Sequence, residues 1–129
     1  MKLYHFCPEH LLERIKREGL TLGMIPVINN GEFVGFIKNR QWLTSNKSFV
    51  QDWETGSSLP YRRNAIRITI KIPKFNMLHL TRWILFDSFG KLEETSKILN
   101  SFGDPENWFI YNGKVLTSWF REITRINNG

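Results

Sequence analysis

The chain has 129 residues, of which 41% are hydrophobic, and carries a formal net charge of +6. This length fits one domain with a substantial core, and the apolar content is that of a globular protein rather than a disordered one. No apolar run approaches the roughly 20 residues needed to span a bilayer, and the first residues lack the apolar core of a signal peptide. We therefore expect a single domain over residues 1–129 that is cytoplasmic and has no membrane partner.

Cysteine content indicates the compartment of the protein, and its charge indicates the class of partner. The only cysteine, Cys7, excludes an internal disulfide and fits a reducing compartment. The positive charge favours a polyanionic or phosphate-bearing partner, although a solvated basic surface explains it equally well. Three dispersed histidines and one cysteine have no spacing typical of a metal site, so we expect no metal.

The first part of the chain predicts a strand, a helix and a second strand. The first strand is expected over residues 2–6, followed by a helix that begins near Pro8 and ends at Gly19. Residues 20–28 are expected to form a connection whose apolar side chains pack beneath it, leading to an Asn-Asn-Gly turn. A second short strand is expected over residues 32–37.

The clearest signal lies at the end of a long polar excursion. Isoleucine occupies every second position from 66 to 72 with polar residues between, which predicts a half-buried strand ended by Pro73. A short apolar segment at residues 41–44 predicts another strand before the excursion. The excursion itself, residues 45–64, is rich in Trp and Arg. We expect it at the edge of a sheet, where ligand-binding loops usually lie.

The rest of the chain mixes clear and ambiguous signals. Residues 78–86 are apolar enough to be buried, but their period does not separate a strand from a helix. Residues 90–102 have the pattern of a helix closed by a glycine. A strand is expected over residues 107–111, and the Asn-Gly pair after it predicts a hairpin. A helical turn at 118–120 and a final strand at 122–126 complete the chain.

This order of elements is an α+β pattern, and three motifs in it resemble the ADP-ribosyltransferase-like family. That family also includes RNA 2′-phosphotransferases and DNA-modifying toxins of the same fold. The motifs are residues 3–6 with 18–20, residues 42–44 with 48–53, and residues 107–110 with 115–120. The resemblance implies two small antiparallel or mixed sheets around a cleft, with a few flanking helices. It also implies NAD as cofactor and ADP-ribose transfer to an unidentified protein or nucleic acid, as in a toxin, phage or mobile-element effector.

The chemistry of NAD cleavage defines what the site must contain. Breaking the nicotinamide–ribose bond creates a ribosyl cation, so the site must bind the diphosphate, hold the ring and place negative charge near the sugar. His5 resembles the family's histidine on the first strand, where a neutral imidazole offers one donor and one acceptor to a ribose hydroxyl. Its structural alternative is a histidine packed beside the first helix. Where the family has its glutamate this chain has Asn107 and Trp108, so the catalytic carboxylate is expected to be Glu106, just upstream.

Aromatic rings, hydroxyls and arginines are the other candidates for contact with NAD. Indole rings offer a large contact area to nicotinamide or adenine, though indoles are also common in cores. Hydroxyls can donate to the ligand or cap turns, and guanidinium forks can grip a diphosphate or remain solvated. The expected cofactor-binding residues are His5, Phe6, Trp42, Thr44, Ser45, Trp53, Arg63 and Trp108, with Arg40, Arg62 and Arg67 as further candidates for the diphosphate.

Two other functions remain open. A non-catalytic module could use the same basic, aromatic cleft to bind nucleic acid or a protein, because interleaved Arg and Trp suit stacking and phosphate contact. An RNA 2′-phosphotransferase-like activity would need several arginines at one site. The argument for NAD as cofactor depends on His5, and it loses its anchor if the side chain of His5 points into a packed interior.

Overall fold

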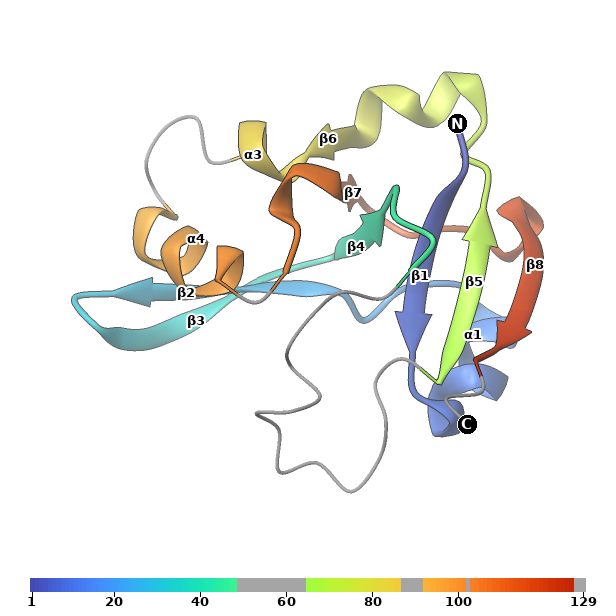
Figure 1. Cartoon of the computed structure of the whole chain (residues 1–129), viewed down its shortest axis with the longest axis horizontal. Helices are drawn as coiled ribbons and strands as arrows, with labels where there is room; N and C mark the ends of the chain where they lie inside the picture. The colour runs from blue at the N-terminus through green and yellow to red at the C-terminus, as the bar shows by residue number, and fades with distance from the viewer. Residues whose placement is uncertain (49–64, 87–91, 102, 127–129) are drawn as a thin grey trace.

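The computed structural model describes residues 1–48, 65–86, 92–101 and 103–126. It is a mixed α+β protein with a six-stranded antiparallel sheet, a two-stranded sheet and short helices (Figure 1). In chain order the elements are β1 (Leu3–Cys7), η1 (Glu9–Leu11), α1 (Leu12–Glu18), β2 (Met24–Asn29), β3 (Glu32–Lys38), β4 (Arg40–Thr44), β5 (Ile66–Ile70), η2 (Lys74–His79), β6 (Leu80–Arg82), α3 (Trp83–Phe86), α4 (Glu93–Asn100), η3 (Pro105–Asn107), β7 (Trp108–Asn112), η4 (Thr117–Trp119) and β8 (Phe120–Arg125).

The six-stranded sheet consists of two halves that meet at a narrow seam. Its strand order is β6-β7-β4-β1-β5-β8. Figure 1 shows β1, β5 and β8 running together, while β4 and its neighbours run crosswise to them. β1 pairs with β5 along its whole length but with β4 only through Tyr4 and Thr44. The two small sheets that we expected are therefore joined into one larger sheet, and the separate second sheet is the β2–β3 pair.

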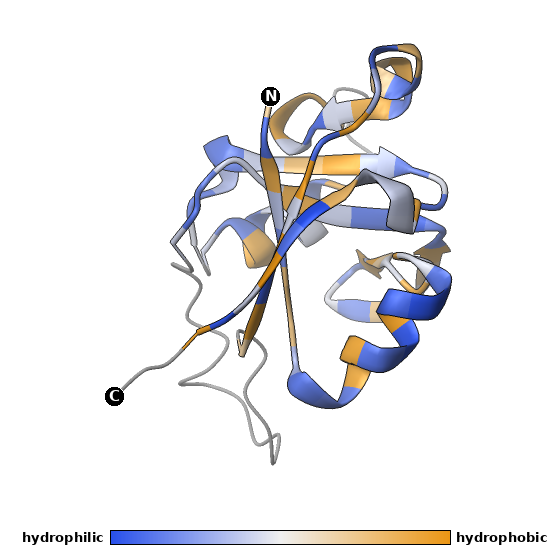
Figure 2. Ribbon diagram, turned by 90° about the vertical axis from the view of Figure 1, so that its right-hand side faces the viewer, coloured by the Kyte–Doolittle hydropathy of each residue, from blue (hydrophilic) through white to orange (hydrophobic). Residues whose placement is uncertain are grey.

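The first half builds its core from the isoleucine strand. The three isoleucines of β5 are fully buried and pack against the inward side chains of β1. α1 covers this face with Leu12 and Ile15 and turns its charged residues outward, as the alternating colours along it in Figure 2 show. The helix ends at Gly19, whose φ of 82° suits a residue without a side chain. The predicted strand and the glycine-capped helix are both confirmed.

The second half has a core of aromatic rings. Trp83 of α3 and Trp108 of β7 are buried together with Ile25 of β2. Trp42 packs against this cluster, its ring centroid 4.9 Å from that of Trp83 and 5.8 Å from that of Trp108. The core of the first half is not confined to its own half of the sheet, because Leu43 of β4 and Tyr111 of β7 also belong to it.

Thr95 fastens α4 to the β2–β3 pair. Its buried hydroxyl accepts a hydrogen bond from the N–H of Ile28 and donates one to the carbonyl of Pro26, both at 3.0 Å. The helix predicted within residues 90–102 is thus confirmed as α4. Ile98 of this helix is 44% exposed although its side chain is apolar.

Residues 20–28 are not the plain connection that we expected. Their second part belongs to β2, which pairs with β3 and places Pro26 opposite Phe36. The stretch is apolar without alternation, so its period does not reveal a strand. Proline is tolerated because β3 is the only partner of β2 within the described residues, which leaves the other edge free of ladder bonds.

The predicted hairpin after β7 is wrong. Both edges of β7 are already paired, with β4 on one side and β6 on the other, so the chain cannot turn back beside it. Instead the N–H of Gly113 donates to the carbonyl of Asn39 at 2.9 Å. Val115 then forms an isolated bridge with Leu20, and the chain crosses to η4 and β8 at the far edge of the sheet.

The structure also shows the ambiguous segment and the last elements of the chain. The ambiguous segment 78–86 contains both kinds of structure, β6 followed by α3, and η4 and β8 confirm the last helical turn and strand. None of the described helices is long and apolar enough to cross a membrane. Residues 49–64, most of the polar excursion that we expected at the sheet edge, lie outside the described residues.

Candidate functional site

The seam between β1 and β4 leaves a small hollow of about 70 Å³, which we call the junction hollow. It opens where the two strands have only one registered pair. Its lining residues are Tyr4, His5, Phe6, Trp42, Leu43, Thr44 and Trp108. Five of the eight expected cofactor-binding residues, from three separate strands, therefore surround one hollow.

His5 bridges the open seam. Its Nδ1 lies 2.9 Å from the carbonyl oxygen of Trp42. Because a carbonyl can only accept, we assign the proton to Nδ1, which leaves Nε2 as the acceptor of a neutral ring. Burial lowers the pKa of His5, and the hydrogen bond to Trp42 opposes that shift without cancelling it. The imidazole is thus neutral at pH 7 and offers a ligand one acceptor.

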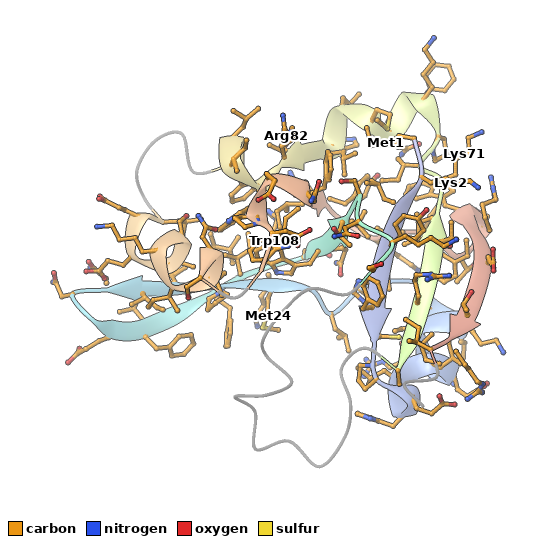
Figure 3. The ribbon with its side chains drawn as sticks, in the orientation of Figure 1. Met1, Lys2, Met24, Lys71, Arg82 and Trp108 are labelled. Atoms are coloured by element: carbon orange, nitrogen blue, oxygen red, sulfur yellow. The ribbon has the colours of Figure 1, made fainter. Side chains whose placement is uncertain are left out.

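The two indoles at the junction hollow are fixed walls. Trp108 is 2% exposed, lies at the centre of the second half in Figure 3, and its Nε1 donates to Asp104 at 3.2 Å. Trp42 is half-buried, and its Nε1 donates to the carbonyl of Met24 at 2.9 Å. Because both N–H groups are already bonded, these rings can offer a ligand contact area but no hydrogen bond.

The two expected hydroxyls serve the backbone. Thr44 Oγ1 accepts the N–H of Asn46 at 3.0 Å. Ser45 is exposed, and its N–H donates to the carbonyl of Asn107 at 2.9 Å while its hydroxyl lies 3.1 Å from Oδ1 of the same residue. These bonds match the capping alternative and tie the end of β4 to η3.

Asp104 accepts three hydrogen bonds in the same region. Its Oδ2 accepts from the side-chain amides of Asn46 and Asn107 at 2.9 and 2.8 Å, and its Oδ1 accepts from the indole of Trp108. We did not expect Asp104 at the site, because the Asp-Pro pair that it begins indicates no more than a turn. No local signal could have shown more, because one of these partners is 58 residues away.

A second, larger hollow of about 180 Å³ lies on the other side of His5, and we call it the helix-side hollow. It is enclosed by α1, by the segment that follows α1 and by β4. Its lining residues are His5, Leu11, Arg14, Ile15, Gly19, Leu20, Thr21, Leu22, Gly23 and Gln41. The lining is mainly apolar. Of the described residues, His5 is the one that lines both hollows.

Gln41 is the polar group of the helix-side hollow. It is 2% exposed, and its Oε1 accepts the N–H of Gly23 at 2.8 Å. Its Nε2 is buried and has no hydrogen-bond partner among the described residues. A buried donor without a partner costs about 1–3 kcal/mol, which a ligand acceptor would recover. A signal for Gln41 was present in the sequence, because it alternates with the apolar Leu43 and must share its inward face.

Gly23 lies too close to β4 to carry a side chain. A Cβ there would be 2.3 Å from the carbonyl oxygen of Arg40 and 2.4 Å from Oε1 of Gln41. The N–H of Arg40 also donates to the carbonyl of Gly23 at 3.1 Å. This close approach fixes one wall of the helix-side hollow.

The two described arginines of the expected set, Arg40 and Arg67, line neither hollow. Among the described residues only Arg14 lines a hollow, and its Nε donates to Glu18 at 2.7 Å, which lowers the pKa of that carboxyl. Arg40 donates to carbonyls of the turn before β4. Arg67 lies over the ring of Tyr4, with 5.9 Å from Cζ to the ring centroid. Outside the described residues are Trp53, Tyr61, Arg62 and Arg63.

Glu106 lies at the rim of the site. It is exposed in η3 and lines neither hollow. Its carbonyl accepts a hydrogen bond from Arg82 at 3.2 Å, and the next residue, Asn107, binds Ser45 at the end of β4. The structure therefore ties η3, which bears Glu106, to the end of β4, and Glu106 lines neither hollow.

Comparisons of the chain with protein-family models, with curated proteins and with solved structures found no match. Within the part of the chain that the structure describes, no three His, Cys, Asp or Glu side chains gather to hold a metal ion. The site is thus defined by its own geometry: two hollows that share the residue His5.

Proposed function

We propose that this protein binds NAD across the two hollows and transfers ADP-ribose to a macromolecular acceptor. The observation that carries this proposal is that His5 lines both hollows. The structure of NAD matches this pair of hollows, because NAD joins two ring-bearing nucleosides through a polar diphosphate. A ligand with one ring in the helix-side hollow and its other end at the junction hollow would pass the imidazole of His5.

The helix-side hollow suits adenine. Its volume of about 180 Å³ exceeds that of an apolar cavity of about 150 Å³ that is known to hold benzene, so a single flat ring system fits. Its apolar lining favours a ring over a sugar or a phosphate. The unpaired Nε2 of Gln41 supplies the donor that a purine ring nitrogen accepts.

The junction hollow suits a smaller polar group. A water molecule occupies about 30 Å³ of liquid, so 70 Å³ accommodates a ribose hydroxyl or a carboxamide rather than a whole nucleoside. Nε2 of His5 would accept a hydrogen bond from such a hydroxyl, and Trp42 and Phe6 would border the bound group. Arg14, at the helix-side hollow, supplies positive charge for the diphosphate.

Transfer requires a carboxylate near the sugar. The bond between ribose and nicotinamide breaks with its electron pair leaving on nicotinamide, and an oxygen or nitrogen of the acceptor bonds to the same carbon and loses a proton. A carboxylate would stabilise the developing positive charge and take up that proton. Glu106 is our candidate because η3 is tied to the end of β4 through Asn107. Asp104 is the poorer candidate, since three hydrogen bonds already occupy its oxygens.

Labelled NAD tests the transfer. The full chain is incubated with NAD labelled in the adenylate and with a cell lysate, and both macromolecular label and free nicotinamide are measured. Glu106→Gln should slow nicotinamide release about 100-fold, a modest effect for loss of a general base. Glu32→Gln removes an exposed carboxylate on β3 and should leave the rate unchanged. If the unaltered protein releases no nicotinamide and transfers no label, it is not a transferase.

Binding is tested separately from transfer by filling the helix-side hollow. Leu22 lines that hollow but is 51% exposed, so Leu22→Trp should block the hollow without disrupting the core. Ile98→Trp, at a similarly exposed position on α4, is the matched control. NAD at 100 times its Kd should stabilise the unaltered protein and the control by about 2.7 kcal/mol and leave Leu22→Trp unshifted. Equal shifts in both variants would place NAD elsewhere.

A second candidate function is binding without transfer. It is favoured by the position of Glu106, which lines neither hollow. It predicts a thermal shift with NAD, or salt-sensitive retention on a polyanionic column, and no release of nicotinamide in either case. An RNA 2′-phosphotransferase-like activity has less support, because Arg40 and Arg67 contact other groups on separate strands.

A further inference from the structure

One end of the β1–β5–β8 half carries an apolar projection that belongs to neither hollow. η2 forms the upper edge of the molecule in Figure 1, and Figure 2 shows hydrophobic and hydrophilic residues next to each other along it. Phe75 is 91% exposed and Leu78 is 77% exposed. Side chains three apart in a 3₁₀ helix lie on the same face, so these two project together.

Lysines surround this projection. Lys2 and Lys71 extend from the paired ends of β1 and β5 and lie near each other in Figure 3, and Lys74 begins η2. All three are exposed. The chain has no Asp or Glu between residues 65 and 86. On the neighbouring β8, Glu122 lies opposite Thr69 and so is set back from this end of the sheet.

We propose, against our expectation of no membrane partner, that this surface, the tip patch of Lys2, Lys71, Lys74, Phe75 and Leu78, docks on a membrane whose surface carries anionic lipids. The two apolar side chains stand out from the protein rather than line a groove. A protein partner would need a matching pocket for them, whereas the boundary between headgroups and acyl chains accepts such side chains directly. The lysines then lie at the level of the headgroups, where the negative surface attracts them.

Single-stranded nucleic acid fits the same surface less well. Bases are held by stacking on aromatic faces and on arginine planes. The tip patch offers one aromatic ring, one aliphatic side chain and lysines, whose ammonium groups act as point charges rather than planar forks. The inference is independent of the proposed function, because no residue of the tip patch lines either hollow.

Vesicle flotation of the full chain tests this docking. The protein should float with phosphatidylcholine vesicles that contain phosphatidylserine and not with phosphatidylcholine alone, and added salt should weaken the binding. The double variant Phe75→Ser with Leu78→Ser should abolish flotation. Phe33→Ser with Val34→Ser removes two exposed apolar side chains from β3 and should not change it.

The charge requirement has its own pair of variants. Lys74→Gln should weaken binding about fivefold, as expected for one lysine at an anionic surface. Lys38→Gln, an exposed lysine on β3, should leave binding unchanged and serves as the control. Circular dichroism verifies that each variant is folded, and Lys74→Gln decides the question if the double variant is not.

Three results would overturn the inference. The first is an absence of binding to phosphatidylserine vesicles. The second is an equal loss in the tip-patch variants and their β3 controls. The third is binding of a labelled oligothymidine that Lys74→Gln weakens without any vesicle binding, which would assign the tip patch to nucleic acid.

Discussion

Replacing His5 by glutamine tests whether the imidazole at the seam is buried and neutral. The change removes a titrating ring and keeps a side-chain donor for the carbonyl of Trp42. Burial lowers the pKa of His5 from its ordinary value of 6.5, so the unfolded chain takes up this proton at a higher pH than the folded protein. The contribution to stability is therefore fully present above pH 6.5 and is lost as the pH falls towards the pKa of the folded state.

The size of the effect follows from one proton. In the window just below pH 6.5 the free energy of unfolding should fall by at most about 1.4 kcal/mol per pH unit through His5 alone. With a urea m-value of about 2 kcal/mol/M, this moves the unfolding midpoint by about 0.7 M per pH unit. Tryptophan fluorescence in urea, recorded between about pH 7 and about pH 5, measures it.

The His5→Gln variant should show a flatter dependence of the midpoint on pH than the unaltered protein. His79→Gln removes an exposed histidine at the end of η2 and should keep the original slope, which makes it the matched control. The same slope in His5→Gln and in the unaltered protein would refute the reasoning. His5, which lines both hollows, would then not be a buried neutral group.

The other predictions concern packing and reactivity. Thr95→Val keeps the side-chain shape but removes both bonds between α4 and β2, so it should lower the free energy of unfolding by about 2 kcal/mol. Thr124→Val, which removes one exposed hydrogen bond to Glu122, should change it by less than about 0.5 kcal/mol. Gly23→Ala forces a Cβ against the carbonyl of Arg40 and should cost about 1–3 kcal/mol in urea unfolding, and an unchanged midpoint would contradict that close approach. Burial raises the pKa of Cys7 to about 12, so the native thiol should resist a thiolate-specific disulfide reagent and react once urea unfolds the chain.

The elements that sequence reasoning predicted are those whose signal is local. The isoleucine alternation of β5 and the glycine that ends α1 are each visible within a few residues, because strand period and capping depend on nearby side chains. β2 was missed because an apolar run without alternation has no period to detect. The Asn-Gly pair after β7 failed for a different reason. Strands distant in the sequence already occupied both edges of β7, and a turn signal contains no information about them.

Some residues of the candidate site could likewise be predicted from the sequence, and others could not. The resemblance brought His5, Phe6 and Trp42 forward as neighbours, and they do line one hollow. Gln41 and Asp104 were missed. The alternation with Leu43 indicates that Gln41 is buried but not that it binds a partner 18 residues away, and Asp104 acquires its role from a partner 58 residues away. Polar residues in a short strand or turn therefore reveal their function only once the long-range pairing is known.

The two hydrophobic clusters differ in the reporter groups that they contain. Trp42, Trp83 and Trp108 belong to one cluster, while the only thiol, Cys7, belongs to the other together with Trp119. In an unlabelled protein, indole emission is thus weighted towards the cluster with three indoles, and thiol accessibility reports the other. Tyr111 of β7 is buried in the cluster that contains Cys7, so the two halves of the sheet share side-chain packing as well as one ladder pair. Both signals should therefore change together, as in a single cooperative unit.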